Sequence, residues 1–123
     1  MPASILKDHS YLIATLQGDL SDAEWVLLRD NLLDKVGQFR SHGVVIDVAG
    51  LDIMDSFATR TLHGIAQACR LRGADSVVVG IRPEIAFTMV QMGWTGRLTN
   101  VRTALDLEDG LALLDRITKS RKP

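Results

Sequence analysis

The sequence has few of the residues on which several classes of small protein depend. Its single cysteine, Cys69, cannot form an internal disulfide, and metal sites built on paired cysteines are excluded. Lys and Arg number 14 against 15 Asp and Glu, so the basic excess of proteins that neutralise nucleic-acid phosphates is missing. There is neither a signal-peptide pattern nor a run approaching the roughly 20 apolar residues of a membrane span. We therefore expect a cytoplasmic protein that binds neither nucleic acid nor membrane, with no metal site and no cofactor.

What is present is the balance of an ordinary globular domain. Apolar residues make up 46% of the chain and charged residues 24%, as in folded rather than disordered or fibrous proteins. A chain of 123 residues buries roughly two thirds of its unfolded surface around one core. No linker, internal repeat or low-complexity segment interrupts the sequence. We expect residues 1–123 to form one domain.

Hydrophobic periodicity predicts an α/β fold, with a mostly parallel or mixed sheet of about four or five strands and about four helices. Strands are expected over residues 4–8, 11–16, 44–48 and 76–81, with a short one around Val101. The run from 44 to 81 is typical of a strand–helix–strand unit, whose two strands should be parallel. The helices are expected over residues 21–43, 56–71, 83–93 and 103–119.

Local signals mark where these helices begin and end. Ser21 and Glu24 form a capping box, Pro83 suits a first turn, and Thr103 with Asp106 makes a weaker box. Gly43 is expected to stop the first helix and Gly93 the third. Helical spacing predicts core positions in the first helix (Trp25, Leu28, Leu32, Val36, Phe39) and in the last (Leu107, Leu111, Leu114).

The helix over residues 56–71 begins in the segment LDIMDSFATRTLHGIAQ, residues 51–67. A helical wheel predicts one buried stripe (Ala58, Leu62, Ile65, Cys69) and an opposite solvent-facing line (Ser56, Thr59, Arg60, His63, Gln67, Arg70). Phe57 belongs to neither set and shares a flank with the small residues Gly64 and Ala68. It either packs on a neighbouring helix or helps a partner to dock.

Ser56 has two readings. Serine is a preferred helix cap, but Asp55 also caps well, and a helix capped by Asp55 leaves the Ser56 hydroxyl free to face solvent. The loop before it follows a parallel strand, and functional groups of open α/β sheets gather beyond the carboxyl ends of such strands. Asp47, Asp52 and Asp55 make the local sequence acidic.

A phosphate on Ser56 would add about 1.5 to 2 negative charges beside these carboxylates. At an effective dielectric of ~20, each unit-charge pair about 7 Å apart costs roughly 2 kcal/mol. The favourable interaction of the phosphate with the helix dipole contributes only about 0.3–1 kcal/mol. Arg60, four residues on, is a possible counter-charge. Phosphorylation would therefore change the surface far more than the fold.

Four runs of sequence together carry a family resemblance. They are VVIDVAGLDIMDSF, the strand SVVVGI, a helix ending in MG, and TALDLEDGL near the C-terminus. In this order they resemble the STAS family, the sulfate transporter and anti-sigma factor antagonist domains, over nearly the whole chain. Within the family the sequence is most similar to the antagonist class of the bacterial stressosome, the RsbS-like class.

The resemblance implies a non-catalytic stress-response protein of signal transduction. Ser56 would be phosphorylated by a switch serine/threonine kinase, which the unmodified protein holds and the modified one releases, and a phosphatase would reverse the step. Thr59 is a secondary candidate for modification. Asp55, Phe57, Arg60 and His63 are the candidate partner contacts around Ser56. The chain would be a scaffold subunit that forms homo- or hetero-oligomers with sensor-bearing STAS paralogues.

The sequence departs from the simple anti-sigma factor antagonists of the family at two positions. Those proteins usually read Asp-Ser-Ser/Thr-Gly, whereas Phe57 and Ala58 follow Ser56 here. The difference favours the stressosome role, with a simple anti-sigma factor antagonist as one alternative. A module that binds a small ligand or nucleotide is another, although neither Gly-x-Gly-x-x-Gly nor a Walker loop is present.

An enzyme is the third alternative, with Ser56 as nucleophile or Asp52 and Asp55 as metal ligands. A nucleophilic serine needs a base within hydrogen-bond reach and an oxyanion hole. No Gly-x-Ser-x-Gly element is present. His63 lies two helical turns from Ser56, about 10 Å by helix rise, and is too distant to activate it. We expect His9 and His42 to be loop residues.

Overall fold

The computed structural model describes residues 3–92 and 101–121. In chain order the elements are β1 (Ala3–Asp8), β2 (Tyr11–Gly18), α1 (Asp22–Phe39), β3 (Gly43–Leu51), α2 (Ser56–Leu71), β4 (Asp75–Val79), α3 (Pro83–Gln91), β5 (Arg102–Ala104) and α4 (Leu107–Arg121). This is the α/β architecture that the periodicity predicts. The described residues form five strands and four helices.

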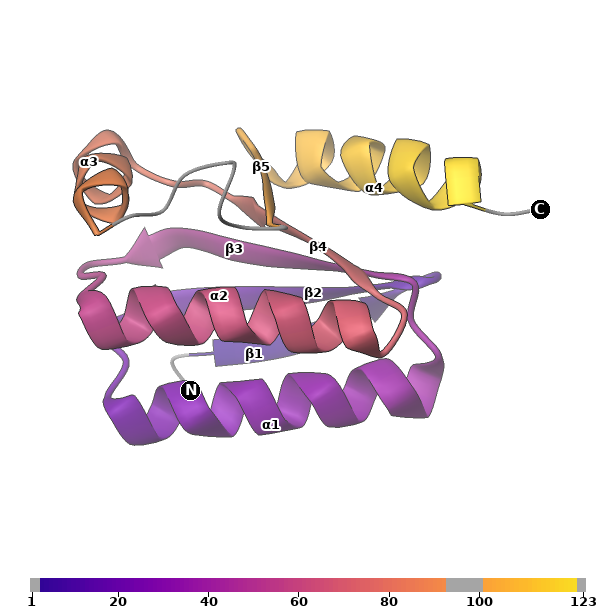
Figure 1. Ribbon diagram of the computed structural model, residues 1–123, viewed down its shortest axis with the longest axis horizontal. Helices are drawn as coiled ribbons and strands as arrows, with labels where there is room; N and C mark the ends of the chain where they lie inside the picture. The colour runs from indigo at the N-terminus through magenta and orange to yellow at the C-terminus, as the bar shows by residue number, and fades with distance from the viewer. Residues whose placement is uncertain (1–2, 93–100, 122–123) are drawn as a thin grey trace.

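The strands form one mixed sheet in the order β1-β2-β3-β4-β5. β1 and β2 are antiparallel and joined by a tight turn, whereas β2, β3, β4 and β5 run parallel. Val44, Val45 and Ile46 pair in register with Ser76, Val77 and Val78, which confirms the predicted parallel unit around α2. All four helices therefore begin near the carboxyl ends of the parallel strands (Figure 1).

Two layers of helix cover the two faces of the sheet (Figure 1). α1 and α2 lie side by side on one face, where the larger apolar cluster includes Trp25, Leu32, Ile46 and Leu62. α4 covers the other face, where Leu114 packs against a smaller cluster of β-strand residues (Ile13, Val45, Val77, Val79). β3 and β4 are covered on both sides, which explains why their sequences are nearly continuous in apolar residues.

The end of α1 differs from the prediction. Ser21 and Glu24 make both hydrogen bonds of the capping box, but Gly43 is the first residue of β3 and does not stop the helix. The stop is Arg40, which adopts the left-handed conformation with φ of 50°. Phe39 was predicted to be core and is 38% exposed, because the helix ends there and its ring lies beside Lys7 and Lys35.

The start of α4 is also corrected. Thr103 and Ala104 lie in β5 and do not open the helix. Asp106 is the capping residue, because its carboxylate accepts a hydrogen bond of 2.9 Å from the Asp109 backbone N–H. Leu114 is fully buried as predicted, but Leu107, in the first turn, is 36% exposed. Gly93, predicted to stop α3, lies outside the described residues.

Candidate functional site

The site begins at the cap of α2. Asp55 has extended backbone angles, and its Oδ1 accepts a hydrogen bond of 2.8 Å from the Ala58 backbone N–H. This is the N-cap geometry, in which one side-chain oxygen satisfies one of the orphan N–H groups of the first turn. The predicted bounds of α2, residues 56–71, agree with the structure at both ends.

Ser56 is the first residue of α2 and is exposed. Because Asp55 makes the cap, the Ser56 hydroxyl is not needed for it, and no hydrogen bond within residues 3–92 and 101–121 engages that hydroxyl. Its place at a helix N-terminus puts it where the backbone dipole favours negative charge. The structure thus presents a primary hydroxyl to solvent at the carboxyl edge of the parallel strands.

Thr59 does not share this exposure. It was predicted to lie on the solvent-facing line, but it is 5% exposed, and its hydroxyl donates a hydrogen bond of 2.9 Å to the Asp55 carbonyl oxygen. The reason is that α2 packs both on the sheet and beside α1, so a second stripe that includes Thr59 and Ala66 is buried next to the first. Phosphorylation of Thr59 would require the first turn of α2 to open.

The carboxylates near Ser56 are fewer than the sequence suggests. Asp47 shares the α4 face of β3 with Val45, two residues before it, whereas α2 covers the opposite face. Its Oδ1 accepts a hydrogen bond of 3.0 Å from the Ala49 backbone N–H. Asp52 and Asp55 remain as the acidic residues that flank Ser56 along the chain. The expectation of three carboxylates around Ser56 is wrong for Asp47.

A positive charge at this edge comes from a residue that the sequence reasoning missed. Arg82, the N-cap residue of α3, donates a hydrogen bond from its Nη2 to the carbonyl oxygen of Leu51, the last residue of β3. Its Nε lies 3.7 Å from Glu84 Oε1. The available signal was topological, since Arg82 follows β4 directly and the carboxyl ends of β3 and β4 adjoin in a parallel sheet.

The remaining candidate contacts lie along α2. Phe57 is half-buried and packs against the larger apolar cluster. Arg60 is exposed, as predicted. His63 is half-buried rather than fully solvent-facing. The predicted buried stripe is confirmed, with exposures of 2% or less for each member (Ala58, Leu62, Ile65, Cys69).

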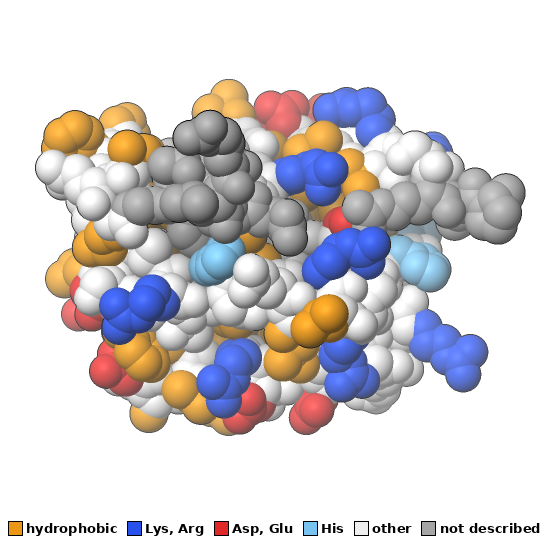
Figure 2. Space-filling view, viewed as in Figure 1, with side chains coloured by type: hydrophobic (Ala, Val, Ile, Leu, Met, Phe, Trp, Pro, Cys, Tyr) orange, Lys and Arg blue, Asp and Glu red, His pale blue; other side chains and the backbone are white. Residues whose placement is uncertain are grey.

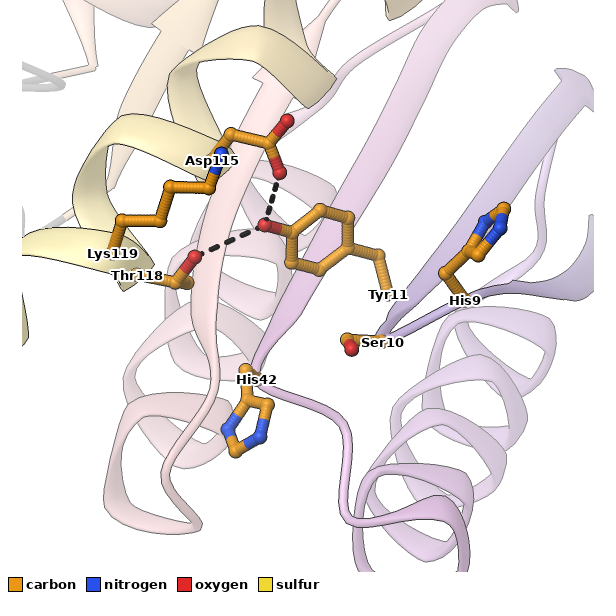
Figure 3. A pocket seen from close by; sticks show the side chains of 7 residues that line it. All are labelled: His9, Ser10, Tyr11, His42, Asp115, Thr118 and Lys119. Atoms are coloured by element: carbon orange, nitrogen blue, oxygen red, sulfur yellow. Dashed lines mark hydrogen bonds between the residues drawn. The ribbon is translucent and has the colours of Figure 1, made fainter. Parts of the chain in front are cut away.

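His9 and His42 lie far from this edge. His9 is in the turn between β1 and β2, and His42 precedes β3, so both belong to the amino-terminal edge of the parallel strands. Figure 3 shows them around a pocket of about 200 Å³ in which the Tyr11 hydroxyl donates a hydrogen bond of 2.6 Å to Asp115. The prediction that both are loop residues is confirmed, and neither can act as a base for Ser56.

Metal binding and membrane insertion can both be judged for the described residues. Among them, no group of three or more His, Cys, Asp or Glu side chains is arranged to hold a metal ion. No helix in this part of the chain has the length and apolar character needed to cross a bilayer.

Comparison with known proteins agrees with this geometry. A family model described as the STAS domain matches residues 3–109. The RsbT co-antagonist protein RsbRC of Bacillus subtilis is 32% identical over 97 residues, which are 79% of this chain and 34% of that protein. RsbRA of the same organism is 33% identical over 99 residues, 80% of this chain and 35% of that protein. The chain thus spans about a third of the length of these curated relatives.

Similar solved structures include stressosome proteins and an anti-sigma factor antagonist. A serine-to-glutamate variant of RsbS from Moorella thermoacetica has a TM-score of 0.83 and 30% identity, covering 97% of this chain and 99% of that one. A chain from the molecular architecture of the stressosome has a TM-score of 0.74 and 30% identity, covering 94% and 99%. The anti-sigma factor antagonist SpoIIAA in its unphosphorylated form, 14% identical with a TM-score of 0.67 and coverage of 94% and 97%, shares the fold.

Proposed function

The chain belongs to the STAS domain family, and from that premise we propose that it is a non-catalytic, phosphorylation-controlled subunit of a bacterial stressosome. In this proposal it holds a switch serine kinase until the kinase phosphorylates Ser56. The observation that carries the proposal is the exposed Ser56 hydroxyl at the start of α2, beside a cap that Asp55 already makes. The resemblance to RsbS, at 30% identity over nearly the full chain, supports the same role.

The electrostatics of the site support a switch by charge. Phosphorylation adds about 1.5 to 2 negative charges and three strong acceptor oxygens. Asp52 and Asp55 flank the serine, while the Arg82 guanidinium is held by the Leu51 carbonyl oxygen and lies near Glu84. A phosphate here would meet unfavourable charge and would project into any bound partner. The expected effect is loss of the partner's contact with an otherwise unchanged fold.

The proposal also covers the location of the chain, its assembly partners and the surface that a partner contacts. The chain acts in the cytoplasm and joins sensor-bearing STAS paralogues, as the relation to the RsbT co-antagonist proteins suggests. Residues 1–123 act as one domain. A phosphatase returns the protein to its kinase-holding form. The partner surface is centred on Ser56 and includes Asp55, Phe57, Arg60 and His63, which line the start of α2 from its cap to its second turn.

The test uses the purified chain with the switch-type serine kinase of the same organism and ATP. We expect mass spectrometry to find one phosphate, on the peptide that contains Ser56. Ser56→Ala should accept none and should stay bound to the kinase when ATP is added. Ser4→Ala, an exposed serine on the edge strand β1, is the matched control and should be phosphorylated and released normally. Ser56 left unmodified under saturating kinase would overturn the proposal.

A further inference from the structure

The end of the molecule opposite Ser56 contains a basic cavity. It has a volume of about 390 Å³ and lies where α1 and α2 end, lined by residues that include Arg40, His42 and Arg72. On the face shown in Figure 2, Lys and Arg side chains gather over this half of the molecule. The cavity shares no residue with the Ser56 site and has no part in the proposed switch.

The two arginines of this cavity lack a counter-charge. Within the described residues no carboxylate lies within ion-pair distance of Arg40 or Arg72. Arg70, two residues earlier in the last turn of α2, is different, because its Nε lies 3.7 Å from the buried Asp75. Cations also favour helix C-termini, and that interaction alone would account for two surface arginines. It does not account for the backbone conformation of Arg40.

The backbone at Arg40 is unfavourable for its residue type. Arg40 has φ of 50°, a left-handed conformation that costs a residue with a Cβ roughly 1 kcal/mol and that glycine adopts freely. Helices commonly end in this conformation on glycine. An arginine at this position therefore lowers the stability of the helix end relative to glycine. Its side chain lines the cavity.

A glycine of α1 lies beside the other arginine. Gly37 lies inside the last turns of α1, where glycine is about 1 kcal/mol less favourable than alanine. The Arg72 guanidinium lies over Gly37, in the space that a Cβ there would take, and this flexible side chain would shift to admit one. The left-handed backbone at Arg40 and the position of Arg72 over Gly37 thus bring two guanidinium groups to one cavity.

We propose that this cavity binds the phosphate group of a small molecule, between inorganic pyrophosphate and a mononucleotide in size. Guanidinium groups bind phosphate oxygens in pairs of charge-assisted hydrogen bonds, and two unpaired ones at one cavity supply such a site. The volume lies in the lower part of the range for ligand pockets, about 300–1,000 Å³. The His42 ring is a further polar group of the lining, whereas the Ser41 hydroxyl is held by the carbonyl oxygens of Ser10 and Gly43.

The test is a titration of the whole chain with pyrophosphate, and separately with AMP, followed by amide chemical shifts at constant ionic strength. We expect saturable shifts concentrated at residues 37–42 and 72–73. Arg72→Gln and Arg40→Gly should each weaken binding by about tenfold, the value of one lost charge-assisted contact. Arg40→Gly should at the same time melt at or above the temperature of the unmodified chain, because glycine relieves the backbone. Arg29→Gln, an exposed arginine of α1 that pairs with Asp30, is the matched control and should bind normally.

Three results would overturn the proposal. One is a set of shifts that sodium chloride at the same ionic strength reproduces. Another is unchanged affinity in both Arg40→Gly and Arg72→Gln. The third is a response to a glutamate-rich peptide with none to pyrophosphate or AMP, which would make the cavity a docking point for an acidic protein segment instead. The outcome is independent of Ser56, since phosphate transfer by the kinase is measured at the opposite end of the molecule.

Discussion

The Asp55 carboxylate accepts a hydrogen bond from the Ala58 backbone N–H, with 2.8 Å between Oδ1 and N. This bond separates the structural role at the start of α2 from the role proposed for Ser56. Asp55→Ala should lower the free energy of unfolding by about 1 kcal/mol, and Asp55→Asn by only a few tenths, because asparagine caps almost as well. Ser56→Ala should change it by less than about 0.5 kcal/mol.

Urea denaturation followed by circular dichroism measures all three variants under one set of conditions. An equal loss of unfolding free energy in Asp55→Ala and Asp55→Asn would mean that the charge of Asp55 stabilises the fold and that its capping hydrogen bond does not. A loss above about 1 kcal/mol in Ser56→Ala would show that the serine has a structural role after all.

Burial of Thr59 leads to a prediction about which hydroxyl is modified. The Thr59 hydroxyl is 2.9 Å from the Asp55 carbonyl oxygen, and that same carbonyl already accepts the Thr59 backbone N–H at 3.0 Å. Thr59→Val keeps the side-chain shape and should cost at most about 1 kcal/mol. With kinase and ATP it should still gain one phosphate at Ser56. Phosphate on Thr59 in the Ser56→Ala variant, detected by peptide mapping, would contradict the prediction.

Local features of this fold could be predicted from the sequence, and features that depend on tertiary packing could not. The bounds of α2 follow from the Asp55 cap and a 3.6-residue period, both of which lie within the segment itself. Thr59 was misassigned because its burial requires α1 as a second neighbour. Asp47 was misassigned because strand alternation turns it to the face that α4 covers. Arg82 was missed because it is close to the Ser56 loop only through the pairing of β3 with β4, and Arg40 because nothing local marks a left-handed arginine.

The hydrogen bond from Arg82 to the Leu51 carbonyl oxygen should support the loop that leads to Ser56. Arg82→Met keeps the apolar stem and removes the donors, so it should lower the free energy of unfolding by about 1–2 kcal/mol. Amide hydrogen exchange should become faster at residues 52–55. Glu84→Gln removes only an exposed partner of Arg82 and should stay within about 0.5 kcal/mol. Equal acceleration of exchange throughout α4 would point to global destabilisation instead.

The only tyrosine, Tyr11, offers a pH measurement at the opposite end of the sheet. Burial, and next the hydrogen bond to Asp115, raise the pKa of its phenol above the ordinary value of 10.0. Because the folded pKa exceeds the unfolded one, the stability from this group is fully present below about pH 10 and is lost as the pH rises through the folded pKa.

Absorbance of the phenolate follows this titration directly. The native chain should ionise at higher pH than the chain in urea. Asp115→Asn removes a negative charge next to the phenol, so it should move the pKa of Tyr11 part of the way back, leaving the part caused by burial. Arg116→Gln, an exposed neighbour on α4, is the control and should leave the titration unchanged. No difference between native and unfolded chains would contradict the burial of this hydroxyl.

The only cysteine makes the opening of the α2 core directly measurable. Cys69 is fully buried on the inner stripe of α2, and its burial raises the pKa of the thiol to about 11. The thiolate is the reactive form, so two effects protect the native thiol: it is inaccessible to solvent, and very little of it is ionised at neutral pH.

A disulfide reagent should therefore modify the urea-unfolded chain rapidly and the native chain only through opening of the structure. The modification rate of the native chain should rise in Asp55→Ala, which weakens the first turn of α2, and stay unchanged in Ser56→Ala. Rapid modification of the native chain at neutral pH would show that α2 does not close over the sheet as tightly as its buried stripe implies.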